Sequence, residues 1–230
     1  RVAKHIEKRV DMFAVAFFEE ARQLSESGIK LPILILQGPH ESRELEFTLT
    51  LDLCWMIHSE EQLSWLKRSE LSPLQFEGRL WFKFDSGMHR LGFALNRFKQ
   101  LKEQYSQYFT SSTVIATHLA CADEAECEHT HKQIASFLEQ VQTANFPLSI
   151  ANSAGTMAHK QARQAFNRLG IAMYGSSPFD PTINDGTQHQ LKNVVTLQAH
   201  IIALRTIPKG DTVGYGATWR APRESVIATV

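Results

Sequence analysis

Short apolar segments alternate with amphipathic segments along most of this chain, and that alternation strongly constrains its fold. The apolar segments span residues 13–16, 33–36, 51–57, 80–84, 113–117 and 148–151, with a weaker one near Phe166. Helical periodicity separates them, as in Ser59 to Lys67, which opens with Ser-Glu-Glu-Gln, and in Thr130 to Val141. Short strands that alternate with helices form parallel sheets, because a parallel connection needs a long crossover. We therefore predict parallel strands covered by helices.

The number of strands predicts a particular closed architecture. Seven apolar segments are one fewer than the eight strands of a (β/α)8 barrel. The chain opens on a helical pattern with Val2, Ile6 and Val10 four residues apart, so the first strand is expected upstream of Arg1. The predicted fold class is an α/β, TIM-type (β/α)8 barrel that lacks its first strand.

A different pattern begins near Pro178. A polar stretch leads into residues 194–207, which are rich in β-branched side chains, and Pro208 to Asp211 has the composition of a turn. The last apolar run, 226–230, is short for a complete strand, so truncation is expected at both ends of the chain. The predicted domains are a barrel over 1–178, a linker over 179–192 and the beginning of a β-rich C-terminal domain over 193–230.

The charge balance argues for a small-molecule partner. The chain has 24 Lys and Arg residues and 24 Asp and Glu residues, so no net field attracts nucleic acid or an anionic membrane. No apolar run is long enough to span a bilayer. The three cysteines form no CxxC pair, which is typical of reduced thiols. We expect a cytoplasmic protein without nucleic-acid or membrane partners.

Polar residues cluster where a barrel usually binds phosphate. The carboxyl ends of barrel strands carry the chemistry, and the loops after the last strands often hold a phosphate group. Asn152 and Ser153 end the segment 148–151, while Gly170 and Ile171 open an expected short helix with free amides. An ordinary helix N-cap explains Asn-Ser-Ala-Gly equally well by itself. The combination of both pairs favours a phosphate site.

Three basic side chains near strand ends each allow two interpretations. Arg168 needs an anion, a ring nitrogen or a stacking partner if it enters the barrel mouth, and otherwise forms a surface ion pair. His118 is an acid, a base or a ring that packs on a cofactor, or else a structural histidine. Lys83 invites a Schiff-base role because burial lowers a lysine pKa. The alternative is a Lys83 paired with Asp85 or another carboxylate.

Two further features leave alternatives open. A zinc-binding module is conceivable on a run of potential ligands: Cys121, Asp123, Glu124, Glu126, Cys127, His129 and His131. The cysteine spacing does not match the usual ligand pairs, and acidic residues also suit a helix start, so we expect no metal. Tyr215 lies between two glycines. It is either a structural tyrosine in a hairpin or a proton donor with a pKa that neighbouring cations lower.

Two motifs resemble the alanine racemase family, the pyridoxal-phosphate enzymes that interconvert L-alanine and D-alanine. Residues 213–219 read Val-Gly-Tyr-Gly-Ala-Thr-Trp, and residues 81–92 read Trp-Phe-Lys-Phe-Asp-Ser-Gly-Met-His-Arg-Leu-Gly. Thr-His-Leu-Ala at 117–120 and Arg-Leu-Gly-Ile at 168–171 are similar to shorter family motifs, with mild departures. The resemblance extends over nearly the whole chain. It implies pyridoxal 5'-phosphate as cofactor, alanine as substrate, and D-alanine supplied for peptidoglycan.

The resemblance also implies roles for individual residues. Tyr215 would move a proton on one face of the substrate, and the family's lysine at the position of Lys83 is often carbamylated and orients an arginine, here Arg90, near the substrate carboxylate. His118 would pack against the pyridine ring, and Arg168 would face its nitrogen. The implied phosphate contacts are Asn152, Ser153, Gly170 and Ile171.

The family pattern implies parts beyond these 230 residues. Two-base proton transfer needs a second base, which in the family is the Schiff-base lysine of a first-strand motif with no match here. In the family the tyrosine enters the partner's barrel, so a homodimer with shared active sites is implied. We expect the chain alone to be inactive. The alternatives are a racemase of another amino acid and a non-catalytic pyridoxal-phosphate-binding protein.

Overall fold

The computed structural model describes residues 1–124, 126–141, 145–180 and 189–230. Contacts divide the chain into two compact units, Arg1–Lys192 and Asn193–Val230. Most of the predicted linker at 179–192 falls on residues 181–188, which lie outside the described residues. Among those that are described, no helix is long and apolar enough to cross a membrane.

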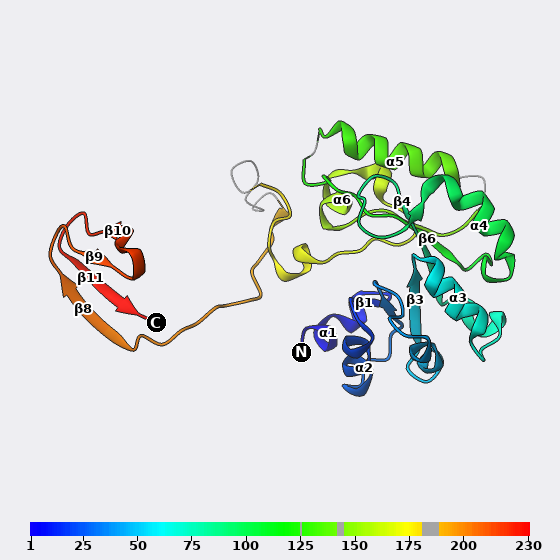
Figure 1. The fold of residues 1–230 in the computed structure, drawn as a ribbon, viewed down its shortest axis with the longest axis horizontal. Coiled ribbons are helices and arrows are strands. Elements are labelled where there is room, and N and C mark those ends of the chain that lie inside the picture. The colour runs from blue at the N-terminus through cyan, green and yellow to red at the C-terminus, as the bar shows by residue number, and fades with distance from the viewer. Residues whose placement is uncertain (125, 142–144, 181–188) are drawn as a thin grey trace. The chain divides into compact units, whose positions relative to one another are not determined.

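The first unit is a curved parallel sheet surrounded by helices (Figure 1). Its strands within the described residues are β1 Phe13–Val15, β2 Ile33–Ile35, β3 Leu53–Ile57, β4 Leu80–Asp85, β5 Phe93–Ala94, β6 Val114–Ala116 and β7 Leu148–Ser149. They pair in the order β1-β2-β3-β4-β6-β7, and β5 pairs with the end of β4. The helices are α1 Val2–Ile6, α2 Phe18–Glu26, α3 Glu60–Arg68, α4 Phe98–Gln104, α5 Glu128–Val141 and α6 Ser153–Ala158. This is part of a TIM-type barrel, as the alternating pattern predicted.

Six of the seven predicted strands are confirmed, and the predicted strand near Phe166 is wrong. Phe166 N donates to Leu148 O at 3.1 Å and Arg168 N donates to Ala151 O at 3.0 Å, so the segment follows the edge of β7. It is not a strand because the Asn167 side chain accepts from Gln164 N and donates to Gln164 O, which bends the chain. The two-residue strand β5 was not predicted.

Strand parity divides the apolar residues between two faces of the sheet. On β3, Leu53, Trp55 and Ile57 belong to the large core that the helices also enter. The alternate residues Cys54 and Met56 belong to a smaller cluster on the other face, which also contains Trp81, Val114 and Ala116. Because side chains alternate along a strand, Lys83 shares this second face with Trp81. Both faces are buried, which explains the nearly continuous apolar runs.

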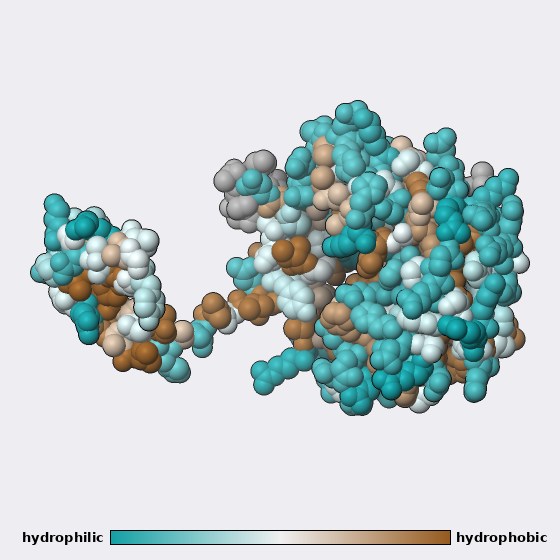
Figure 2. Space-filling model, viewed as in Figure 1, coloured by the Kyte–Doolittle hydropathy of each residue, from teal (hydrophilic) through white to brown (hydrophobic). Residues whose placement is uncertain are grey.

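The second unit contains two antiparallel strand pairs. β8 Ala203–Ile207 pairs with β11 Ser225–Thr229, and β9 Thr212–Val213 pairs with β10 Trp219–Arg220. The predicted turn is confirmed, since Asp211 N donates to Pro208 O at 3.3 Å. Within the apolar run 194–207, only the last five residues pair as a strand, because the ladder with β11 starts at Ala203. Several apolar residues before β8 are exposed: Val194, Val195, Leu197, Ile201 and Ile202. Figure 2 shows brown, hydrophobic atoms along this segment.

Candidate active site

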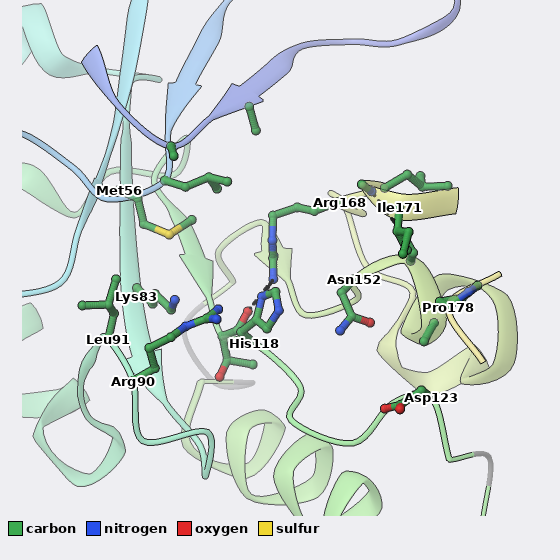
Figure 3. A pocket seen from close by; sticks show the side chains of 18 of the residues that line it. Met56, Lys83, Arg90, Leu91, His118, Asp123, Asn152, Arg168, Ile171 and Pro178 are labelled. Carbon is green, nitrogen blue, oxygen red and sulfur yellow. Dashed lines mark hydrogen bonds between the residues drawn. The ribbon is translucent and has the colours of Figure 1, made fainter. Parts of the chain in front are cut away.

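A cavity of about 660 Å³ opens at the carboxyl ends of the strands in the first unit. Eight of the nine predicted site residues line it: Lys83, Arg90, His118, Asn152, Ser153, Arg168, Gly170 and Ile171. They come from β4, from the loops that follow β4 and β6, from the start of α6, and from the segment 168–171 that follows α6. Figure 3 shows Lys83, Arg90, His118, Asn152, Arg168 and Ile171 around the cavity. Residues as far apart as 83 and 171 therefore meet in one place, as expected for the carboxyl edge of a parallel sheet.

Lys83 lies on β4 opposite Ala116 and is only 8% exposed. Desolvation, together with the positive charges of Arg168 and Arg90, lowers its pKa to about 8. Among the described residues no ion pair joins Lys83 to Asp85 or to another carboxylate, so the predicted alternative of such a pair is wrong. With a pKa of about 8, roughly a tenth of Lys83 is a neutral, nucleophilic amine at pH 7.

The Asp85 carboxylate organises the loop that carries Arg90. Its Oδ1 accepts the main-chain N–H groups of Gly87, Met88 and His89 at 2.9, 2.9 and 3.1 Å. Burial alone would raise the pKa of Asp85, but these amide hydrogen bonds outweigh burial and hold the pKa below its usual range. The loop closes where β5 pairs with β4, and Arg90 projects from it into the cavity (Figure 3).

A hydrogen bond between Arg168 and His118 fixes the state of the imidazole. Arg168 Nη2 lies 3.3 Å from His118 Nδ1, and an arginine always donates, so Nδ1 accepts and its proton is absent. Desolvation lowers the pKa of His118 to about 3, with further contributions from Arg168, Lys83 and Arg90. His118 is therefore neutral at physiological pH. The geometry favours a ring that packs against a ligand over an imidazolium acid.

The guanidinium of Arg168 is held by barrel main chain. Its Nη2 donates to Thr117 O at 2.7 Å and to Ile150 O at 3.3 Å, and its Nη1 donates to Ser149 Oγ. Burial lowers the Arg168 pKa to about 10. These acceptors are neutral, so they do not balance the positive charge of Arg168. The surface ion pair that the sequence offered as an alternative for Arg168 is not observed among the described residues.

The predicted phosphate residues converge, although two of them also serve the fold. Asn152 Oδ1 accepts Gly155 N at 2.9 Å, so Asn152 caps α6, as the N-cap interpretation expects. Ser153 Oγ accepts Gly170 N at 2.9 Å and Ala172 N at 3.4 Å. This contact brings the loop of Gly170 and Ile171 against the start of α6.

Tyr215, the ninth predicted residue, belongs to the second unit. It begins a short 3₁₀ turn, Tyr215–Ala217, between Gly214 and Gly216, whose φ angles are 77° and 75°. Positive φ angles of this kind favour glycine. The side chain of Tyr215 is fully exposed, which leaves its hydroxyl available to another surface.

Sequence reasoning missed several residues of the cavity. Gln37 and Met56 line it from the ends of β2 and β3, and Ser149 receives the Arg168 hydrogen bond from the concave face of β7. Strand parity was the available signal for Met56 and Ser149, since both share a face with Lys83. In the described part of the chain, no three His, Cys, Asp or Glu side chains gather as metal ligands.

The charge of the cavity suits an anionic ligand. Lys83, Arg90 and Arg168 line it, and among the described residues of the lining Asp123 is the single carboxylate. Buried cations without enough carboxylates are stabilised by an anion. Fold and cavity together define a barrel-type α/β protein with a cationic site for a small anionic ligand, joined to a β-rich unit.

Comparisons with known proteins identify the family within this class. Residues 1–178 match the family model described as alanine racemase, N-terminal domain, and residues 194–230 match the alanine racemase C-terminal domain. The chain therefore belongs to the alanine racemase family, and the resemblance seen in its motifs is confirmed.

Individual relatives agree with this family assignment, and the alignments show what share of each relative the chain covers. An alanine racemase of Alteromonas mediterranea is 37% identical over 100% of this chain and 62% of its own length. The crystal structure of a biosynthetic alanine racemase from Pseudomonas aeruginosa matches with a TM-score of 0.87 at 33% identity, over 98% of this chain and 62% of that one. An alanine racemase from Bartonella henselae with covalently bound pyridoxal phosphate matches with a TM-score of 0.76 at 25% identity, over 96% and 60%. The chain thus spans about three fifths of the relatives it matches.

Proposed function

We propose that the complete protein containing this chain interconverts L-alanine and D-alanine with pyridoxal 5'-phosphate as its cofactor. One observation carries the proposal: Lys83, Arg90, His118 and Arg168 line a single cationic cavity in a member of the alanine racemase family. The Bartonella henselae relative with covalently bound pyridoxal phosphate supports the choice of cofactor.

The chemistry of the cavity fits this cofactor. Ser153 Oγ and the amide at Gly170 lie together at one side, where they and Asn152 and Ile171 would hold the phosphate group. A neutral His118 would pack against the pyridine ring without adding charge. Arg168 would face the ring nitrogen, and because a guanidinium is not deprotonated, it would leave that nitrogen without a proton.

The remaining residues would bind and orient the substrate and move protons. Bound pyridoxal phosphate supplies an electron sink that acidifies the α-proton of an amino acid. Arg90 would bind the substrate carboxylate. Lys83, with a pKa of about 8, has the neutral amine that carbon dioxide needs to form a carbamate, and the resulting anion would hold Arg90 in place. Tyr215 would exchange a proton on one face, and a lysine outside these 230 residues would serve the other.

The proposal extends to the whole protein. Residues 1–178 would form the cofactor-binding barrel, 179–192 a linker, and 193–230 the beginning of the β-rich domain. We propose a cytoplasmic homodimer in which Tyr215 of each subunit completes the site of the other. Its product would be D-alanine for peptidoglycan, and the 230-residue chain by itself would be inactive.

Two experiments on the full-length protein test the proposal. The first follows formation of D-alanine from L-alanine, with other small amino acids as alternative substrates. The second reduces the pyridoxal-phosphate complex with borohydride and maps the labelled lysine. A label outside residues 1–230 supports the assignment, whereas a label on Lys83 would make Lys83 the cofactor anchor and overturn its orienting role. Cofactor binding without turnover of any amino acid would favour a non-catalytic carrier.

A further inference from the structure

The loop that carries His118 is held in place by side chains of other elements. It connects β6 to α5, and four of its main-chain groups are satisfied from outside it. The side chain of Gln133 forms hydrogen bonds with His118 O and Ala120 N. Asn152 Nδ2 donates to Leu119 O at 3.4 Å. His159 Nε2 lies 3.0 Å from Ala122 O. Of these side chains, only Gln133 engages the main chain of His118 itself.

Gln133 lies on α5 and is 1% exposed. Its Oε1 accepts Ala120 N at 2.9 Å and its Nε2 donates to His118 O at 3.2 Å. It occupies a position of the apolar stripe formed by Ile134, Phe137 and Val141, where an amide without partners would be unfavourable. The two hydrogen bonds to the loop compensate for that burial.

The same side chain also reaches the loop that carries Arg90. Gln133 Nε2 lies 3.5 Å from Ser86 Oγ, and a Cβ atom on Gly87 would lie 3.2 Å from Gln133 Cγ. Ser86 Oγ in turn shares a 2.8 Å hydrogen bond with Thr117 Oγ1, in the residue before His118. Gln133 therefore contacts the two loops that deliver His118 and Arg90 to the cavity, and it is not itself among the described residues that line the cavity.

We propose that Gln133 is a positioning residue that fixes the His118 loop relative to the Arg90 loop, and so sets the affinity of the site for the pyridine ring of its ligand. This inference rests on the proposed function. It distinguishes two parts of the site, because among the described residues the hydrogen bonds of Gln133 reach His118, Ala120 and Ser86 but not Ser153 or Gly170. Loss of Gln133 should therefore weaken recognition of the ring and spare recognition of the phosphate.

The test uses two variants of nearly the same size in the full-length protein. Gln133→Met removes both hydrogen bonds, whereas Gln133→Glu keeps an acceptor for Ala120 N but, when ionised, cannot donate to His118 O. Gln140 lies exposed on the same helix, so Gln140→Met and Gln140→Glu are matched controls. Circular dichroism and thermal melting of each apo-protein establish that the variants are folded.

The measurement is the dissociation constant of pyridoxal phosphate, with inorganic phosphate as a competing ligand whose own constant follows from displacement. We expect both Gln133 variants to raise the pyridoxal-phosphate constant about tenfold, with the phosphate constant within about twofold of wild type and the Gln140 variants unchanged. Equal weakening of both ligands would show a merely structural role and overturn the inference, as would unchanged pyridoxal-phosphate affinity. Failure of the wild-type protein to bind pyridoxal phosphate would instead overturn the proposed function, and this inference with it.

Discussion

The imidazole of His118 lies beside the Arg168 guanidinium and has no carboxylate partner among the described residues. Its pKa falls from 6.5 to about 3, mainly through desolvation. Between these values the unfolded chain binds a proton that the folded chain does not, so folding stability decreases as pH falls through this window. Above about pH 6.5 both states are neutral at this site and the contribution is constant.

Replacing His118 should therefore reduce the sensitivity of the fold to acid. In His118→Asn the amide oxygen can still accept from Arg168. We expect the decline in unfolding free energy between about pH 6 and pH 4 to become shallower by up to about 1 kcal/mol per pH unit. Urea denaturation of the full-length apo-protein at several pH values measures this slope. The exposed His5→Asn is the control, and an unchanged slope in the His118 variant would contradict the assigned burial effect.

Arg168 influences the acid–base behaviour of two neighbours at once. Its positive charge is the second-largest cause of the lowered pKa of both Lys83 and His118, after desolvation. Arg168→Met should raise the Lys83 pKa above about 8 by roughly half a unit to one unit, without restoring the value of 10.5. The pH dependence of Lys83 acylation, followed by mass spectrometry, reports this pKa. Acylation profiles that coincide in the two proteins would show that Arg168 is too well screened to matter.

At the scale of elements, the short strand β5 holds the Arg90 loop closed. Gly92 has a φ of 128°, and a Cβ atom there would lie 2.9 Å from Asp85 N. Gly92→Ala therefore combines backbone strain with a collision against main chain, and should cost about 2–4 kcal/mol of stability. Gly170→Ala is the control, because a Cβ at Gly170 meets nothing within 4 Å. Chemical denaturation compares the two, and equal losses would contradict this account.

The local sequence pattern was sufficient to predict the main strands and helices. It was insufficient where contacts between distant residues determine the backbone conformation. Ser59 was predicted to open a helix, and it caps α3 by accepting Gln62 N. The sequence near Phe166 resembled a strand, but side-chain bonds of Asn167 bend it. β5 is two residues long and exists only through its pairing with β4, so periodicity could not indicate it.

The candidate site shows the same division. Strand ends and family motifs predicted eight of the residues that line the cavity. The strand ends were informative because the carboxyl ends of parallel strands lie at one edge of the sheet. Gln133 was not predicted, since its role depends on which loop main chain lies opposite its helix. A glutamine on an otherwise apolar helix stripe was the available signal. Polar residues at core positions therefore merit attention when such sites are read from sequence.

At the scale of the whole molecule, the location of Tyr215 leads to a test of shared active sites. Tyr215 is fully exposed in the second unit, while Arg90 lines the cavity of the first. If each site combines the barrel of one subunit with Tyr215 of its partner, a mixed dimer of Tyr215→Phe and Arg90→Ala subunits contains one intact site and one doubly altered site. If each subunit supplies its own tyrosine, every site in that dimer is altered.

The experiment refolds or co-expresses the two full-length variants and measures alanine racemisation. Each variant alone should be nearly inactive if the proposed roles hold, because one would lack the proton-transfer group and the other the group that binds the substrate carboxylate. Random mixing makes half of the dimers mixed, so about a quarter of wild-type activity should return. Unmixed samples at the same total concentration are the control. Activity that stays at the level of the separate variants, in a sample shown to contain mixed dimers, would place Tyr215 in its own subunit's site and overturn the shared arrangement.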